Sequence, residues 1–404
     1  MIKIPTIYNL QSITTLHFGL CKEAMKVFSY LESDQYTYFK DIEHLKCTLI
    51  KRIGNIPLSP LGIDFNNKEQ LNLISNDKGR TIISSGVELC NFVYRGQTQF
   101  FDECKPNIFR SNLNNGGIDL LAKLIDVTKA IVFEEALDFH PYINLLNDRR
   151  KLEHYETHPN EKFRAKAIFV SQCLHENPFY VNKYALSQHY GFSTSLLDTT
   201  SNLDVAAFFA TCEYDTVLNE YVPIERKECG VFYVIAWFYE DIIDKFDFIG
   251  WQPLPMSRPE EQRACSFKLH ISDNLNKMPH VFKFRFEHDK NKSRDIYNLF
   301  CSGENNLFAR DKLMDKVVED IKNEHEFDEK HLRQAYNRLL EYFPNQIESY
   351  ETMLEAIKKR TDEKILITNN IDLKKRYMNE FQDKDYRADF TEVINKVVVR
   401  PVIY

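Results

Sequence analysis

Apolar and polar positions along the chain follow a strand-like spacing in three places. Runs rich in β-branched and aromatic residues predict strands at 87–97 (VELCNFVYRGQ), 229–239 (CGVFYVIAWFY) and 280–288 (HVFKFRFEH). The second run is apolar almost throughout, which is typical of a central strand buried on both faces. In the third run, charged residues alternate with three phenylalanines, as in a strand with one buried face.

Helical spacing prevails elsewhere. Apolar residues three and four positions apart predict packed helices between about 115 and 185, and again after about 310 among dense mixed charge. In the last stretch, 389–404, the β-branched Val397–Val399 and the nearby Pro401 favour a short strand instead. Together these elements predict an α+β protein, with a mixed or antiparallel central sheet flanked by helices and helical additions at both ends.

The length of 404 residues predicts more than one structural unit, because single cores rarely keep growing beyond about 300 residues. We expect an N-terminal ancillary α/β region at 1–84, which contains the polar connector NNKEQLNLISNDKGR. The central unit is expected at 85–325, and a C-terminal helical region at 326–404.

Composition and charge indicate the general class of the protein. Hydrophobic residues make up 43% of the chain, with few glycines and prolines, so we expect a folded protein with a large core. The net charge of −7 provides no overall attraction to nucleic acid or to an anionic membrane. The N-terminus lacks the features of a signal peptide and no long apolar run occurs, so we expect a cytoplasmic protein.

Motifs for metals and for common nucleotide folds are also missing. The nine cysteines include no CxxC pair, and no HExxH occurs, so we expect buried thiols and no metal. The sequence lacks the GxxxxGK and GxGxxG loops, which argues against a P-loop NTPase and a Rossmann dehydrogenase.

A first candidate cluster begins at the end of the first predicted strand. It contains Tyr94, Arg95, Gly96 and Gln97, and continues with KPNIFR, which ends at Arg110. The glycine lets a backbone or a ligand approach closely, and the arginines offer planar donor groups for phosphate or carboxylate. The structural alternative is a core arginine paired with a buried acid.

A second candidate cluster spans residues 187–200, SQHYGFSTSLLDTT, and leads through Asn202 into the apolar run VAAFFA. Its many hydroxyls at a helix entrance are suited to binding anions or hydroxylated ligands, although turn and cap chemistry explains part of the pattern. His189 is expected to act as a base or to orient its neighbours. The candidate ligand-binding residues here are Gln188, Ser193, Thr194, Ser195 and Asp198.

These two clusters, in this order, resemble the FRG domain family. Its aromatic-RGQ motif and the following K-P-x-L/I-F-R segment are similar to 94–97 and 105–110, and its Gln-His string with the Ala-x-Phe-Phe-Ala helix is similar to 188–210. This chain has Ser195 where the family commonly has arginine.

Weaker similarities extend the resemblance toward residue 325. They are Gly230 with its strand, and 305–311 (NNLFARD), which lacks the family's proline. The segment EEQRACSF at 260–267 stands where the family has Gln-x-Gly-x-Phe, and it lacks the glycine. Gln262 aligns with the family's glutamine to within one or two positions.

A looser resemblance connects the chain to mono-ADP-ribosyltransferases of the Arg-Ser-Glu type. Tyr94–Gly96, the Ser-Thr-Ser string at 193–195 and Glu260 or Glu261 occur in the order of that family's motifs. The resemblance implies NAD as substrate, with Arg95 on the pyrophosphate and a glutamate at the oxocarbenium-like centre. Together with the FRG motifs, this makes Arg95, His189, Glu261 and Gln262 the candidate catalytic residues.

Three functions remain open at this point. One is a NAD-using transferase or glycohydrolase in a bacterial defence or toxin context, acting on an unknown protein or nucleic-acid acceptor. Another is a module that senses a nucleotide or binds a partner protein from a defence operon without catalysis. The third is a structural protein in which Arg95 pairs with Asp198, for instance. The residues expected to meet in one cleft are Arg95, Gln97, Arg110, Gln188, His189, Thr194 and Asp198, with Glu261 and Gln262 as later contributors.

Overall fold

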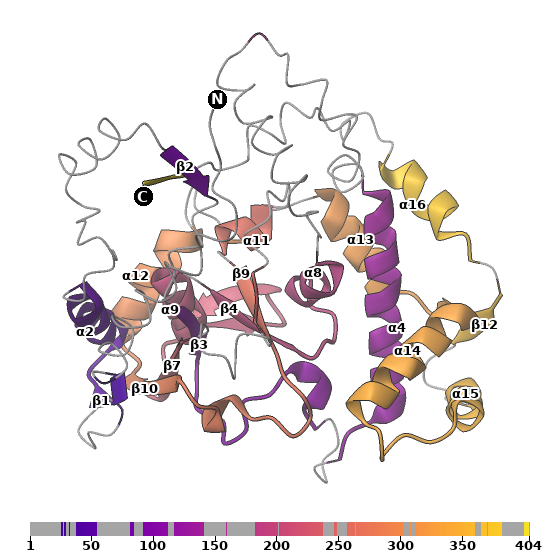
Figure 1. The fold of residues 1–404 in the computed structure, drawn as a ribbon, viewed down its shortest axis with the longest axis horizontal. Helices are drawn as coiled ribbons and strands as arrows, with labels where there is room; N and C mark the ends of the chain where they lie inside the picture. The colour runs from indigo at the N-terminus through magenta and orange to yellow at the C-terminus, as the bar shows by residue number, and fades with distance from the viewer. Residues whose placement is uncertain are drawn as a thin grey trace.

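A computed structural model describes the greater part of the chain. The described residues are 26, 28–29, 32, 38–54, 81–84, 92–111, 117–140, 159, 182–200, 202–236, 246–248, 257–262, 264–301, 307–308, 312–359, 365–369, 371–381 and 400–403. They form an α+β protein in which a mostly antiparallel sheet is flanked by helices (Figure 1), so the predicted fold class is confirmed.

The largest sheet among the described residues has seven strands, in the order β1-β10-β7-β3-β4-β9-β8. Neighbouring strands are antiparallel, except that β1 runs parallel to β10. The bounds, in sheet order, are Tyr38–Phe39, Val281–Glu287, Cys229–Ile235, Val93–Gln97, Leu196–Thr200, Ala264–Lys268 and Phe246–Phe248. The three predicted strands are therefore confirmed as β3, β7 and β10, which lie side by side.

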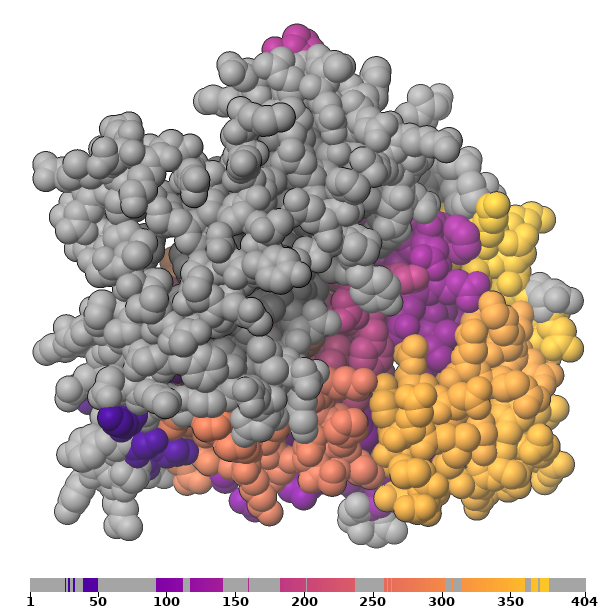
Figure 2. Space-filling model, in the orientation of Figure 1, coloured from indigo at the N-terminus to yellow at the C-terminus, as the bar shows by residue number. Residues whose placement is uncertain are grey.

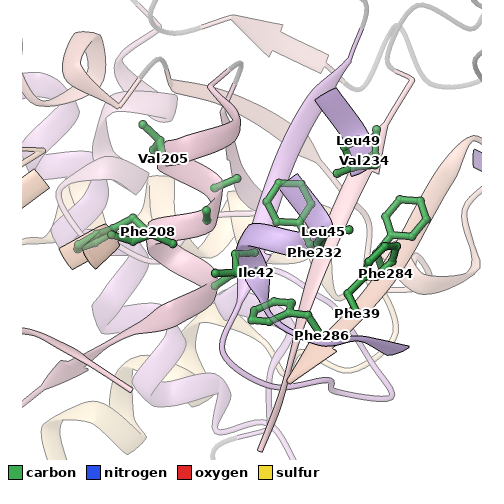
Figure 3. Close-up of a cluster of buried hydrophobic side chains, with 14 of the residues drawn as sticks. Phe39, Ile42, Leu45, Leu49, Val205, Phe208, Phe232, Val234, Phe284 and Phe286 are labelled. Atoms are coloured by element: carbon green, nitrogen blue, oxygen red, sulfur yellow. The ribbon is translucent and has the colours of Figure 1, made fainter. Parts of the chain in front are cut away.

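One face of this sheet packs against helices α2 (Ile42–Gly54), α9 (Leu203–Thr211) and α12 (Lys290–Cys301). Figure 3 shows Phe232 of β7 and Phe284 and Phe286 of β10 in this core, with Phe208 entering from α9. The three phenylalanines of β10 are buried while Arg285 and Glu287 are exposed, as the alternation in the sequence predicted. Each buried phenylalanine stabilises this packing by about 1.5–3 kcal/mol.

The opposite face carries a second apolar cluster. Val93 of β3, Leu197 of β4 and Tyr233 of β7 pack there with Cys104 and Leu275, which belong to segments outside the strands. Odd-numbered residues of β3 therefore face this cluster, while even-numbered residues face α9.

The helices of the C-terminal region pack on α4. Helix α4 (Leu120–Ala136) begins at Asp119, whose side chain accepts from Ala122 N, 3.0 Å away. Its apolar face shares a core with α14 (Glu329–Tyr342) and α15 (Tyr350–Lys359). Figures 1 and 2 show this contact between the purple α4 and the orange C-terminal helices. The helices predicted after about residue 310 are confirmed by α14 and α15, and by α13 (Lys312–Lys322) and α16 (Leu373–Phe381).

Three small sheets complete the described structure. Strand β13 (Arg400–Ile403) pairs antiparallel with β2 (Thr81–Ser84), which joins the two terminal regions. The short strand predicted in 389–404 is present as β13, while Val397–Val399 lie outside the described residues. Strands β5 (Cys212–Asp215) and β6 (Glu220–Pro223) form a hairpin after α9, and β11 (Glu326–Asp328) pairs with β12 (Leu366–Thr368). The helices predicted between about 141 and 181 also lie outside the described residues, apart from Pro159.

Candidate functional site

The site begins where strands β3 and β4 diverge. The two strands share the pair Tyr94–Thr200; beyond it β3 continues beside β7, and β4 continues beside β9. Arg95 bridges the separating strands, because its Nη1 donates to the backbone carbonyl of Asp198, 2.5 Å away. The first strand thus places an arginine at a gap in the sheet.

Helix α8 (Lys183–His189) delivers the Gln-His motif to the same place. Its N-terminus is capped by Asn182, whose side chain accepts from Ala185 N at 2.9 Å. The helix ends just before Gly191, which has φ +82° and lets the chain turn back toward β4. The glycine thereby brings β4 back alongside the helix that precedes it.

Gln188 connects this helix to the strand. Its Nε2 donates to Asp198 Oδ2 at 3.2 Å, and its Oε1 accepts from the hydroxyl of Thr194. The side chain of Asp198 is 43% exposed, so the cluster is accessible from the surface. Four of the predicted site residues, Arg95, Gln188, Thr194 and Asp198, are therefore brought together by hydrogen bonds.

His189 lies in the same cluster. Its side chain is 3% exposed, and its Nε2 lies 3.8 Å from Asp198 Oδ1. Burial lowers the pKa of His189 below its usual value, the charge of Asp198 and a hydrogen bond with Gln262 oppose this, and the charge of Arg258 adds to the lowering. The imidazole is neutral at pH 7, with one ring nitrogen able to accept a proton.

Gln262 and Arg258 enter from the segment around α11 (Ser257–Glu261). Gln262 is buried. Its side-chain Nε2 donates to Leu307 O at 3.1 Å, and its backbone carbonyl accepts from the Thr200 hydroxyl at 2.7 Å. The guanidinium of Arg258 lies 5.4 Å from the centre of the Tyr190 ring, in a cation–π contact. The same guanidinium lies 5.7 Å from the centre of the Phe308 ring.

Arg258 was not among the site residues predicted from the sequence. It precedes Glu260 by two positions and Glu261 by three, the two glutamates that the transferase resemblance offered as candidates. The signal available was a second arginine near the chain's Glu-Glu-Gln segment.

Two more predicted residues lie at the edge of the cluster. Arg110 has an exposed side chain whose Nε donates to Lys105 O at 2.9 Å. Neighbouring protein atoms remove part of the water around its guanidinium, and this desolvation, followed by the positive charge of Arg95, lowers the pKa of Arg110. Gln97 is buried and accepts from Cys104 Sγ at 3.7 Å, on the same face of β3 as Arg95.

Tyr94 and Gly96 lie on the other face of β3. Tyr94 packs against Phe232, with ring centres 5.9 Å apart. A Cβ on Gly96 would lie 1.9 Å from the carbonyl of Ala206 and 2.6 Å from Ala210 N. The glycine is therefore required by the close packing of α9 on the strand.

The serines of the Ser-Thr-Ser string contact other helices. Ser193 donates to Asp126 Oδ2 of α4 at 3.1 Å. Ser195 has no exposed surface and its hydroxyl lies 2.9 Å from that of Tyr184. Thr194, between them, is the member that reaches Gln188. The string immediately precedes β4, so the motif stands before the strand rather than within it.

The other residues predicted from motif order have these positions. Glu261 is exposed on α11, and the side chain of Glu260 lies outside the described residues. Asn202 caps α9 by accepting from Asp204 N at 2.8 Å and Val205 N at 3.4 Å, which confirms cap chemistry for that residue.

Several buried polar atoms in this cluster have no hydrogen-bond partner within the described part of the chain. They are Arg95 Nε, His189 Nε2, Asp198 Oδ1 and Arg258 Nε. Leaving a buried donor or acceptor unpaired costs about 1–3 kcal/mol each, so several such atoms in one cluster call for an explanation. The cluster contains the guanidinium groups of Arg95 and Arg258, with that of Arg110 at its edge, and the carboxylate of Asp198. The cluster is therefore cationic and suited to an anionic ligand.

Within the described residues, no group of three or more histidine, cysteine or acidic side chains has the arrangement of a metal site. No helix in the same part of the chain is long and apolar enough to cross a membrane.

The comparison with family models identifies the central part of the chain. Residues 90–217 match the model of the FRG domain, so the chain contains an FRG domain. The match begins just before β3 and ends in the β5–β6 hairpin. It includes Arg95, α8, β4 and α9, while Arg258 and Gln262 lie beyond it. No curated protein and no solved structure matches the chain.

Proposed function

We propose that this FRG domain binds a phosphate-bearing nucleotide, with NAD as the first candidate, at the cluster around Arg95 and Asp198. The observation that carries the proposal is the convergence of unpaired buried atoms from Arg95, His189, Asp198 and Arg258, in a cluster that the partly exposed side chain of Asp198 connects to the surface. Arginine is the residue that best matches phosphate oxygens, because its planar guanidinium donates two parallel hydrogen bonds.

Each group has a role in this proposal. Arg95 keeps one nitrogen on the Asp198 carbonyl and offers Nε to a phosphate oxygen. Arg258 supplies a second positive charge beside His189. Asp198 holds Gln188 with one oxygen and offers the other to a ribose hydroxyl. An anionic ligand with hydroxyl groups would thus accept hydrogen bonds from the unpaired arginine nitrogens and donate one to the unpaired oxygen of Asp198. In a bacterial defence or toxin setting, such a ligand would act as a signal.

Cleavage of NAD is the second candidate. The observation that favours it is the position of Gln262, from the Glu-Glu-Gln segment, beside the neutral His189. In this reaction the bond between ribose C1′ and the nicotinamide nitrogen breaks, and nicotinamide leaves with the bonding electrons. Water or an acceptor hydroxyl adds to C1′, and its proton passes to His189 and then to solvent.

The test is titration calorimetry of the full chain with NAD, ADP-ribose and inorganic phosphate, alongside measurement of nicotinamide release. Arg95→Ala, with folding checked by circular dichroism, should weaken NAD binding about tenfold or more, because a charge-assisted contact to phosphate is lost. Arg294→Ala is the matched control, since its side chain is 52% exposed and pairs with Glu225.

The outcomes separate the candidates. Binding without nicotinamide release supports the sensing module. Release that disappears in folded Arg95→Ala supports the enzyme. If the folded wild-type protein binds none of the three compounds, the nucleotide proposal is wrong and the structural interpretation of Arg95 replaces it.

A further inference from the structure

A chain of hydroxyl groups connects the C-terminal helices to the FRG domain. The Tyr184 hydroxyl accepts from Ser195 N at 2.6 Å and lies 2.9 Å from Ser195 Oγ. The same hydroxyl lies 2.6 Å from that of Tyr342, the last residue of α14. Tyr184 and Tyr342 are 158 positions apart in the sequence, so the contact is a product of the fold.

A partly buried ion pair holds the two sides of this junction. Arg338 of α14 donates to both carboxylate oxygens of Glu134 of α4, at 2.7 and 3.0 Å. The Arg338 guanidinium also lies 5.0 Å from the centre of the Tyr184 ring. Burial raises the pKa of both tyrosine hydroxyls, so they are neutral at pH 7 and take part as donors and acceptors.

Tyr184 is placed to transmit this contact to the candidate site. It precedes Gln188 by four residues on α8, so the two side chains lie on the same face of the helix. Its second partner, Ser195, is adjacent to Thr194, whose hydroxyl donates to Gln188. Tyr184 therefore constrains Gln188 by two routes, one through the helix and one through residues 194–195. Gln188 in turn donates to Asp198.

From these contacts we infer that Tyr342 is a positioning residue of the nucleotide site, which it serves through Tyr184, Ser195 and Gln188. The inference rests on the proposed function for its ligand. Its physical basis is that the Tyr342 hydroxyl fixes the Tyr184 hydroxyl, which sets the rotation of α8 and the position of Thr194. The C-terminal helices, outside the residues that match the FRG model, thus belong to the working unit of the site.

The test compares two conservative substitutions on the same helix. Tyr342→Phe removes the hydroxyl at the junction. Tyr336→Phe is the matched control, because it removes a hydroxyl that donates to the Glu348 carbonyl at 2.9 Å, away from the site. Two quantities are measured: the NAD affinity, and the NMR resonances of the His189 ring in the ligand-free protein, assigned with a His189→Gln variant.

Tyr342→Phe should weaken NAD binding about fivefold to tenfold, the equivalent of one lost hydrogen bond, and should move the His189 resonances. Tyr336→Phe should leave both unchanged. Ser195→Ala, which removes only the hydroxyl partner of Tyr184, should act in the same direction and provides a second variant if Tyr342→Phe does not fold.

The two readouts distinguish this inference from the proposed function. If His189 moves in Tyr342→Phe while the wild-type protein binds no nucleotide, the coupling stands and the ligand proposal fails. If the wild-type protein binds nucleotide and neither readout changes in folded Tyr342→Phe or Ser195→Ala, Tyr342 has no positioning role and the inference is overturned.

Discussion

The Nη1 atom of Arg95 donates to the backbone carbonyl of Asp198 at 2.5 Å, across the point where β3 and β4 separate. The contact therefore connects two strands that no longer pair with each other there. A guanidinium keeps further donors after making such a contact, because it carries five N–H groups. The same arginine can thus stabilise the sheet and contact a ligand.

The position of Arg258 predicts a specific loss of ligand binding. Arg258→Gln should reduce the affinity for ADP-ribose about tenfold, because one positive charge beside His189 is removed. Calorimetry at two salt concentrations checks this, since the variant should also show a weaker salt dependence. Arg333→Gln is the control: Arg333 also lies over a tyrosine, 4.2 Å from the centre of the Tyr350 ring, but outside the cluster. Equal losses in the two variants would contradict the assignment.

The packing of α9 on β3 predicts a strong effect at Gly96. Gly96→Ala should lower the free energy of unfolding by about 3 kcal/mol or more, because the new Cβ would overlap backbone atoms of Ala206 and Ala210. Gly191→Ala should cost about 1–2 kcal/mol, since φ is +82° but the nearest atom belongs to the flexible Lys322 side chain. Urea unfolding compares the two. A milder effect at Gly96 than at Gly191 would show that α9 does not pack as closely as described.

The pair of Glu134 and Arg338 predicts strong coupling between α4 and α14. Arg338→Ala should destabilise the protein by about 2–4 kcal/mol, because Glu134, 16% exposed, would lose both hydrogen bonds. Arg333→Ala removes the exposed pair with Glu329 and the contact with the Tyr350 ring, and should cost at most about 1 kcal/mol. A double-mutant cycle with Glu134→Gln measures the coupling, and a coupling energy near zero would contradict this prediction.

Buried histidine predicts sensitivity to acid. Burial lowers the pKa of His140 from 6.5 to about 3. Below pH 6.5 the unfolded chain therefore binds a proton that the folded chain does not, so stability is present above this pH and is lost as the pH falls. The loss from this residue is about 1.4 kcal/mol per pH unit until about pH 3.

Unfolding measured from pH 7 to pH 4 tests this expectation. His140→Gln should have a shallower acid dependence than the wild-type protein by that slope. His270→Gln, at an exposed position, serves as the control. Parallel acid profiles for wild type and His140→Gln would contradict the prediction.

Local sequence patterns predicted the longer strands because the order of apolar and polar residues along a strand shows which of its faces are buried. The alternation in 281–287 and the apolar run from Cys229 correspond to β10 and β7. Strands β4 and β9, five residues each, were not predicted. The run LLDTT of β4 is too short to show a period, and its hydroxyls are equally typical of a turn.

The two motif clusters determined by themselves that Arg95, Gln188, His189, Thr194 and Asp198 were candidates for one site. The tertiary structure decided which of their neighbours belong to it. Tyr94 and Gly96 face α9, on the opposite side of β3 from Arg95, because successive residues of a strand point to opposite faces, and only the position of α9 tells which face is covered. The Ser195 hydroxyl contacts that of Tyr184, which in turn contacts that of Tyr342. Arg258 enters from a segment more than 60 residues after the Gln-His motif. Contacts of this kind depend on where distant elements pack, which residue spacing within a motif does not encode.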